Sequence, residues 1–108
     1  MEHTALSAII KDRNDEAREI IELLLKNKAN PNAVDKMGQS AIFYSVAFNR
    51  VDLCQILLKD PSTDLEIIDD FGQNVLEYAQ ALGRGEIAEM MREEKMFRRA
   101  FSEMEDEN

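Results

Sequence analysis

The chain has very few of the residues on which most catalytic sites depend. Its 108 residues include one histidine and one cysteine. The histidine, His3, lies in a terminal segment that we expect to fray, so a histidine-centred catalytic pair would have no rigid frame. The single cysteine, Cys54, excludes an internal disulfide framework and agrees with a reducing compartment. Its neighbours Leu53 and Leu57 indicate a small buried hydrophobe, not a nucleophile. We therefore expect no enzyme.

The chain also lacks the sequence features that mark ligands, membranes and export. It has no glycine-rich phosphate loop and no Cys/His metal spacing, so we expect no cofactor and no metal. No apolar run approaches the roughly 18 residues that span a bilayer. Residues 1–4 lack the basic start and apolar stretch of a secretory signal. These absences favour a cytoplasmic location.

Charge is one-sided. The chain carries 22 acidic and 13 basic residues, for a net charge of -9. The negative electrostatic potential around such a chain opposes direct binding to nucleic acid or to an anionic membrane, so we expect neither as a partner. With 44% apolar and 32% charged residues, the composition is typical of one folded domain and not of a disordered chain.

What the chain does contain is a repeat. The segment Asp35–Ile42, which reads DKMGQSAI, recurs 34 residues later as Asp69–Leu76, which reads DDFGQNVL. The register continues through the pairs Ser45/Ala79, Asn49/Gly83, Leu53/Ile87, Ile56/Met90 and Leu57/Met91. Such a period is typical of stacked repeats that bury their apolar faces against one another. The function is therefore expected on an extended surface and not in a pocket.

Each unit is predicted to be a turn, a short helix, a tight reversal and a longer helix. In the second copy, the turn is 35–39 and Ser40 is a good N-cap for a helix over 41–48. Asn49 tolerates the left-handed conformation of a reversal, and the longer helix is predicted over 51–59.

The other two copies follow the same plan. In the third, Asn74 takes the cap position, Gly83 ends the first helix, and the next helix begins near Glu86. In the first, Thr4 caps a helix over 5–11, and a polar link precedes a helix with one buried stripe. We expect two stacks of equivalent core residues, namely Leu24, Leu57 and Met91, and Leu6, Ile42 and Leu76.

These units resemble ankyrin repeats, whose pattern begins Asp-x-x-Gly-x-Thr-Pro-Leu-His. The matching residues are Asp35, Gly38, Ser40, Ile42, Leu57 and Leu58 in the second copy, and Asp69, Gly72, Leu76, Ala79 and Gly83 in the third. The resemblance implies an all-α ankyrin-repeat solenoid of helix-turn-helix units joined by hairpin loops. The array would occupy 1–92, as units of about 4–34, 35–68 and 69–92, with a helical extension and acidic tail over 93–108.

The chain departs from the family in the Thr-Pro-Leu-His segment. Its proline and histidine are missing from all three copies, so we expect an array less stable than an idealised one. Glu77 stands where the family has histidine, and we expect no role for it beyond solvation.

The resemblance also places a binding surface. In ankyrin arrays the turn tips and the exposed side of the first helices form a concave face that usually meets partners. The corresponding candidates here are Met37, Gln39, Phe48, Ile68, Phe71, Gln73 and Leu82. The large apolar members Met37, Phe48, Phe71 and Leu82 are expected to form one contiguous patch. The alternative is that Phe48 and Phe71 turn inward.

A second candidate surface lies beyond the repeats. From Ile87 onward, apolar residues continue at spacings of three and four through Phe97, Phe101 and Met104, as in a coiled-coil seam broken by Glu94. This helix is expected to fold back over the last repeat as a cap. The alternative is that it docks in a groove of a partner.

The sequence thus predicts a non-enzymatic protein–protein interaction module, an adaptor or inhibitor, monomeric by itself. Its acidic surroundings favour a partner protein with a basic surface. Two alternatives stay open. One is an acidic regulatory subunit that masks a basic, nucleic-acid-binding partner and could therefore be nuclear. The other is a bacterial effector acting on host proteins in the host cytosol, which small diverged ankyrin proteins with Glu-rich ends resemble.

Overall fold

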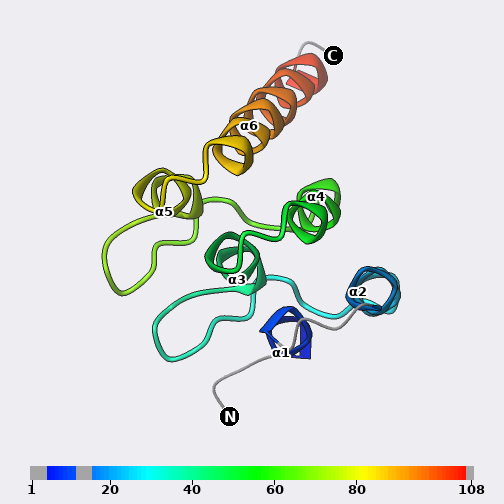
Figure 1. The fold of residues 1–108 in the computed structure, drawn as a ribbon. Helices are drawn as coiled ribbons and strands as arrows, with labels where there is room; N and C mark the ends of the chain where they lie inside the picture. The colour runs from blue at the N-terminus through cyan, green and yellow to red at the C-terminus, as the bar shows by residue number, and fades with distance from the viewer. Residues whose placement is uncertain (1–4, 12–15, 107–108) are drawn as a thin grey trace.

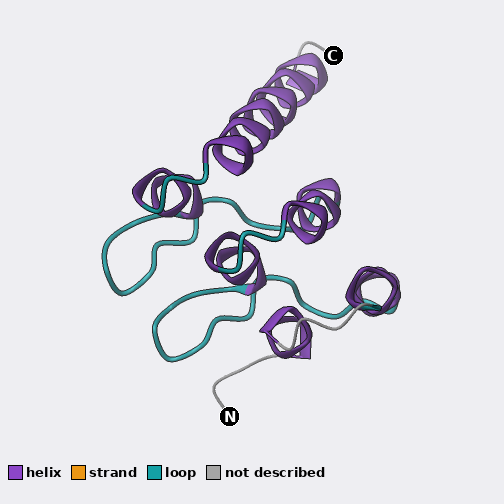
Figure 2. Cartoon of the chain, viewed as in Figure 1, coloured by secondary structure: helices purple, strands orange, loops and turns teal. Residues whose placement is uncertain are grey.

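The structure is a computed structural model that describes residues 5–11 and 16–106. Within them it contains six helices and no strand (Figures 1 and 2). The helices are α1 Ala5–Lys11, α2 Ala17–Lys26, α3 Ala41–Ala47, α4 Val51–Lys59, α5 Val75–Ala81 and α6 Gly85–Asp106. The all-α fold is therefore confirmed. The predicted Thr4 cap and His3 lie outside the described residues.

The helices stack in two layers. Helices α1, α3 and α5 form one layer, and α2, α4 and α6 form the other (Figure 1). Each helix packs against its partner within the unit and against the equivalent helix of the next unit. The long loops before α3 and α5 project from the first layer as two parallel fingers (Figure 1). These fingers carry the turn segments that the sequence repeats.

The predicted reversals have the backbone that their residues suit. Asn49 between α3 and α4 has φ 53°, and Gly83 between α5 and α6 has φ 73°. The N–H groups of Arg50 and Arg84 then donate to Ser45 and Ala79 at 2.8 and 2.9 Å. The same backbone geometry thus closes both units, as the register predicts.

One apolar core runs through all three units. Its fully buried members include Leu6, Ile42, Leu53, Leu57 and Met91. Leu24 and Leu76 belong to the predicted stacks but are only partly buried at the edge of this core. Cys54 is also fully buried, and this burial raises the pKa of its thiol to about 11. The interpretation of Cys54 as a buried hydrophobe is confirmed.

The two predicted N-caps, Asn74 and Ser40, differ from each other. Asn74 caps α5 as predicted, and its Oδ1 accepts the N–H of Glu77 at 2.9 Å. The Glu77 carboxylate in turn accepts the N–H of Asn74 at 2.9 Å, which completes a capping box. The expectation that Glu77 has no role beyond solvation is therefore wrong. Ser40 occupies the N-cap of α3, but its buried Oγ finds no hydrogen-bond partner among the described residues.

Helix α6 is much longer than its counterparts. It has 22 residues, compared with 9 in α4 and 10 in α2. The expectation that the extension folds back over the last repeat is wrong, because α6 continues without a turn past the proposed array boundary at residue 92. Good helix formers and the i,i+4 ion pair between Arg98 and Glu94, at 2.7 Å, favour this continuation.

Arg98 holds the extension against the second unit. Its guanidinium donates to the carbonyl of Thr63 at 2.6 Å and to those of Leu58 and Asp60 at 3.2 Å. These carbonyls follow or end α4 and have no helical partner for their oxygens. Lys95 adds an ion pair with Glu66 at 3.1 Å. The helix is thus fixed as far as residue 98.

Candidate functional site

An aspartate shapes each of the two turn tips. Oδ1 of Asp35 accepts the N–H groups of Met37 and Gln39 at 2.9 and 3.0 Å. Oδ1 of Asp69 accepts those of Phe71 and Gln73 at 3.0 and 3.1 Å. This side-chain geometry closes a tight turn without helix or sheet. It places Met37 and Phe71 at equivalent points of neighbouring tips.

The two tips are joined directly to each other. The N–H of Asp70 donates to the carbonyl of Met37 at 2.9 Å. A Cβ atom at Gly38 would lie 3.0 Å from Oδ1 of Asp70 and 3.2 Å from the backbone of Asp69, and Gly38 has φ +77°. Only glycine suits both the close approach and this backbone. The tips therefore form one continuous edge.

Asp69 is the polar centre of this edge. It is buried, and its Oδ2 accepts the side-chain amides of Gln39 at 3.1 Å and Gln73 at 3.2 Å. Burial alone would raise the pKa of Asp69, but these hydrogen bonds and those from the turn backbone outweigh it and leave the pKa below its usual value. The predicted binding residues Gln39 and Gln73 are thus half-buried. Gln39 joins the two tips, whereas Gln73 bonds Asp69 within the same turn.

Four apolar side chains remain exposed around the tips, and we call them the turn-tip surface: Val34, Met37, Ile68 and Phe71. Phe71 is the most exposed at 64%, followed by Ile68 at 57%. Phe71 therefore does not turn inward. Because the turns are tied by Asp35 and Asp69, these side chains project from a preorganised backbone, which lowers the entropy cost of binding.

The other two apolar candidates lie elsewhere. Phe48 and Leu82 are the C-cap residues of α3 and α5, at the far ends of seven-residue helices from the tips. A helix of that length spans about 10 Å. Phe48 is also half-buried and packs on Tyr44, with ring centroids 6.5 Å apart, whereas Leu82 is 42% exposed. The structure thus places the four predicted residues in two groups and not in one contiguous patch.

The second candidate surface lies on α6. Met96, Phe97, Ala100, Phe101 and Met104 are all exposed on one side of the helix, and we call this set the α6 face. The Phe97 and Phe101 rings pair at 6.3 Å. They border a groove of about 480 Å³ whose opposite wall is Lys59 and Pro61 at the end of α4.

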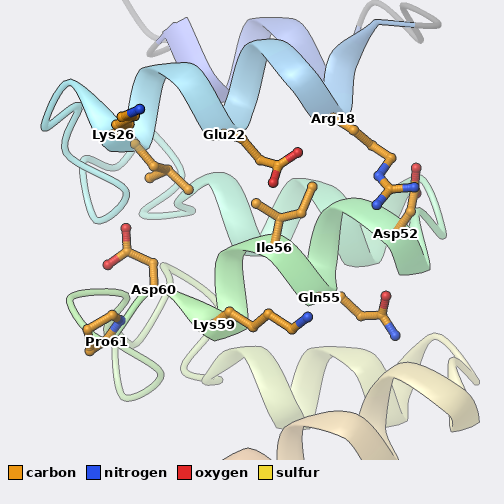
Figure 3. A pocket seen from close by; sticks show the side chains of 10 residues that line it. Arg18, Glu22, Lys26, Asp52, Gln55, Ile56, Lys59, Asp60 and Pro61 are labelled. Carbon is orange, nitrogen blue, oxygen red and sulfur yellow. The ribbon is translucent and has the colours of Figure 1, made fainter.

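Another groove lies between α2 and α4 (Figure 3), and no sequence pattern predicts it. It encloses about 420 Å³. Arg18 and Glu22 of α2 face Asp52 and Lys59 of α4 across it. Arg50 donates to Asp52 at 3.2 and 3.3 Å, and although burial opposes it, this pairing keeps the pKa of Asp52 below its usual value. Charges of both signs alternate here, so the groove favours neither anions nor cations.

The described residues include one thiol and no cluster of metal ligands. Among them, no group of three or more His, Cys, Asp and Glu side chains could hold a metal ion. None of the described helices is both long and apolar enough to cross a membrane. Cys54, the one nucleophilic thiol, is fully buried and protonated at neutral pH.

Comparison with known proteins agrees with this geometry. The family described as "Ankyrin repeats (3 copies)" matches residues 3–98. An ankyrin repeat protein of Acanthamoeba polyphaga mimivirus is 31% identical over 74 residues. The match covers 68% of this chain but 18% of the viral protein, so the chain spans less than a fifth of that relative's length.

Proposed function

The chain belongs to the ankyrin-repeat family, and from this premise we propose that it is an adaptor or inhibitor that binds another protein through its turn-tip surface. Ankyrin repeats are protein–protein interaction modules and generally not enzymes. The more specific role of adaptor or inhibitor rests on the geometry of the turn-tip surface. The observation that carries it is the 64% exposure of Phe71 on a turn whose backbone is fixed by Asp69.

The chemistry of the surface supports this role. Large apolar and aromatic side chains dominate the energetic centres of protein interfaces. A monomer exposes such residues in adjacent positions at a cost in solubility, so their presence at Met37, Ile68 and Phe71 favours an interaction site. Holding Phe71 and Met37 on tied turns means that little conformational entropy is lost when a partner binds.

The partner that we propose is a protein with a basic surface. The chain carries a net charge of -9, and Asp70 is exposed directly beside Phe71. Complementary charges around an apolar centre raise the association rate and fix orientation more than they raise affinity. A basic nucleic-acid-binding protein held inactive by this chain, and a host protein bound by a secreted effector, are both special cases of this partner class. The single buried Cys54 supports a cytoplasmic site of action.

The test compares variants in binding to a partner recovered with the intact chain. Phe71→Ala should weaken binding by about 2 kcal/mol, or roughly 30-fold, when measured by calorimetry on the purified pair. The free energy of unfolding of Phe71→Ala, measured by thermal unfolding, should stay within about 0.5 kcal/mol of the parent value, because the side chain is exposed. Raising the salt concentration should slow association and leave dissociation nearly unchanged.

Two matched variants locate the site. Leu23→Ala removes a side chain of similar exposure, 59%, from α2 in the other helical layer, and should leave affinity unchanged. Phe97→Ala removes a side chain that is 65% exposed from α6, and it should also leave affinity unchanged. If Phe97→Ala weakens binding and Phe71→Ala does not, the turn-tip surface is not the site. Equal losses from all three variants would indicate non-specific apolar adhesion and would contradict the proposal.

A further inference from the structure

Ser102 carries an exposed hydroxyl on the side of α6 that faces the repeats. At about 100° per residue, it lies about 20° around the helix from the buried Met91 and about 40° from Arg98. Arg98 precedes it by four positions, a spacing at which two side chains on a helix are neighbours. Ser102 therefore lies one turn beyond the contacts that Arg98 makes with the end of α4.

Two cations line the same groove as Ser102. The groove of about 480 Å³ between α4 and α6 is bordered by Lys59, Arg98 and Ser102. Lys59 is exposed, and its ammonium group makes no ion pair or hydrogen bond within residues 5–11 and 16–106. The carboxylate in the lining, that of Glu94, is already paired with Arg98 at 2.7 Å. The groove thus presents the charge of Lys59 to Ser102 without a competing anion.

Arg98 has one hydrogen still to donate. Each Nη atom of arginine carries a pair of hydrogens. Nη2 donates to the carbonyls of Leu58 and Asp60, both at 3.2 Å, whereas Nη1 donates to the carbonyl of Thr63 at 2.6 Å. The second hydrogen on Nη1 has no partner among the described residues. An anion on Ser102 could accept it without displacing a carbonyl.

We propose that Ser102 is a phosphorylation site, and that its phosphate bridges Lys59 of α4 and Arg98 of α6. Phosphoserine carries about -1.5 to -2 charges at pH 7 and forms charge-assisted hydrogen bonds with cations. In the unmodified chain, no hydrogen bond or ion pair among the described side chains of 99–104 reaches the repeats. The phosphate would therefore tie to α4 a part of α6 that is otherwise held only by its own helix. The proposal is independent of the turn-tip surface.

The sequence after Ser102 indicates the class of enzyme that adds the phosphate. Residues 103–107 read EMEDE, so a protein kinase with a basic substrate groove has the complementary charge. In the transfer, Ser102 Oγ forms a bond to the γ-phosphorus of ATP, and the bond from that phosphorus to the β,γ-bridging oxygen breaks. ADP leaves, and the hydroxyl proton passes to a base of the kinase. Because the last turns of α6 make few contacts, opening them to enter the kinase costs little.

Repulsion opposes the bridge and makes the contribution of Lys59 measurable. A phosphate close to the acidic residues of 103–107 and to the C-terminal end of a helix is unfavourable by itself. Lys59 and Arg98 face it across a groove that Phe97 and Phe101 also line, and these rings reduce screening by water. With both cations present, attraction should therefore outweigh repulsion. Without Lys59, repulsion should dominate.

Incubation of the full chain with ATP and an acidophilic serine kinase tests the site. Mass spectrometry should place one phosphate on Ser102, and Ser102→Ala should abolish the incorporation. The matched control is Ser62→Ala, which should incorporate as much phosphate as the parent. Ser62 is exposed between Asp60 and Asp64, but its Oγ donates to Asp60 Oδ1 at 2.6 Å and Asn32 holds its carbonyl at 2.7 Å. A phosphate on Ser62 instead, or none on Ser102, overturns the proposal.

Hydrogen exchange tests the bridge. In the phosphorylated chain, the amides of 99–106 should exchange roughly 2- to 5-fold more slowly than in the unmodified chain, as expected of an exposed ion pair. In phosphorylated Lys59→Ala they should exchange faster than in unmodified Lys59→Ala, because only repulsion remains. Lys26→Ala removes the equivalent exposed last residue of α2 and should keep the slowing. Faster exchange in the phosphorylated parent, or equal slowing in Lys59→Ala, overturns the bridge.

Discussion

Gln39 and Asp69 lie 30 positions apart in the sequence, and a hydrogen bond of 3.1 Å from the Gln39 amide to Asp69 Oδ2 joins them. This bond links the turn of the second unit to the turn of the third. Asp69 also accepts two backbone N–H groups and the Gln73 amide. One buried carboxylate therefore fixes both the shape of its own turn and the position of that turn beside its neighbour.

The first prediction concerns Asp69. Asp69→Asn should destabilise the fold at pH 7 by about 1–3 kcal/mol, because Nδ2 would then face the donor groups of Gln39 and Gln73. Since the pKa of Asp69 is lowered in the fold, its contribution is present above the unfolded-state value of about 3.9 and is lost as pH falls through the folded value. The difference between parent and variant should therefore shrink on acidification. Urea unfolding at a series of pH values measures this.

The exposed neighbour Asp70 provides the control for Asp69. Asp70→Asn removes the same charge from the same turn, but only the backbone of Asp70 bridges the tips. It should change stability by less than about 0.5 kcal/mol. Equal losses from the two variants would show that net charge, and not the hydrogen bonds at Asp69, sets the acid sensitivity.

The second prediction separates two N-cap positions that look alike in sequence. Asn74→Ala should cost about 1 kcal/mol, because it removes the bond to the Glu77 N–H. Ser40→Ala should cost at most a few tenths, since the Ser40 Oγ is buried and makes no cap bond among the described residues. Thermal unfolding of the two variants measures the difference. A larger loss from Ser40→Ala than from Asn74→Ala would contradict the assigned caps.

The capping pair permits a stricter measurement. Glu77→Gln keeps the acceptor for the Asn74 N–H and should be nearly neutral, whereas Glu77→Ala should lose several tenths of a kcal/mol. A double-mutant cycle with Asn74→Ala should give a coupling energy above zero, because the two bonds are reciprocal. Zero coupling would mean that the two residues act independently.

Much of the fold follows from the 34-residue register, because local chemistry sets the repeating parts. The bounds of α4, the reversal at Asn49 and the turn at Asp35 depend on residues close in sequence. The capping box at Glu77 is also encoded locally, because Asn74 and Glu77 form the pattern Asn-x-x-Glu at the start of α5.

The inter-repeat contacts were not predictable in the same way. Arg84 donates to the carbonyls of Val46 and Ala47, both at 3.1 Å, and Arg98 reaches carbonyls more than 30 positions away. These bonds depend on the spacing of helices in neighbouring units, which no local pattern encodes. The same holds for the groove between α2 and α4, and for the separation of Phe48 from Phe71. Which exposed face meets a partner is a question about a second molecule.

The third prediction concerns Cys54. With its pKa raised to about 11 by burial, the thiol stays protonated at pH 8 and should react with a disulfide reagent only when the chain unfolds. The unfolded thiol ionises near pH 8.5, so between about pH 8.5 and 11 the unfolded state binds fewer protons and stability should fall as pH rises. Cys54→Ala should remove this alkaline slope. Rapid labelling of the native chain would contradict the burial of Cys54.

The last prediction compares two adjacent arginines of α6. Arg98 donates to three carbonyls of the second unit, whereas Arg99, with its side chain 84% exposed, pairs with Glu103 at 3.4 Å on the same helix. Arg98→Ala should therefore cost about 1.5–3 kcal/mol, and Arg99→Ala less than about 0.5. Arg98→Lys should not restore stability, because one ammonium group cannot reach the three carbonyls as a planar guanidinium does.

Hydrogen exchange of the backbone amides tests whether Arg98 anchors the extension, which the stability measurement alone does not show. Amides after about residue 94 should exchange faster in Arg98→Ala and unchanged in Arg99→Ala, since Arg98 anchors the extension to α4. Equal protection in both variants would show that α6 needs no anchor and persists by its own helical propensity.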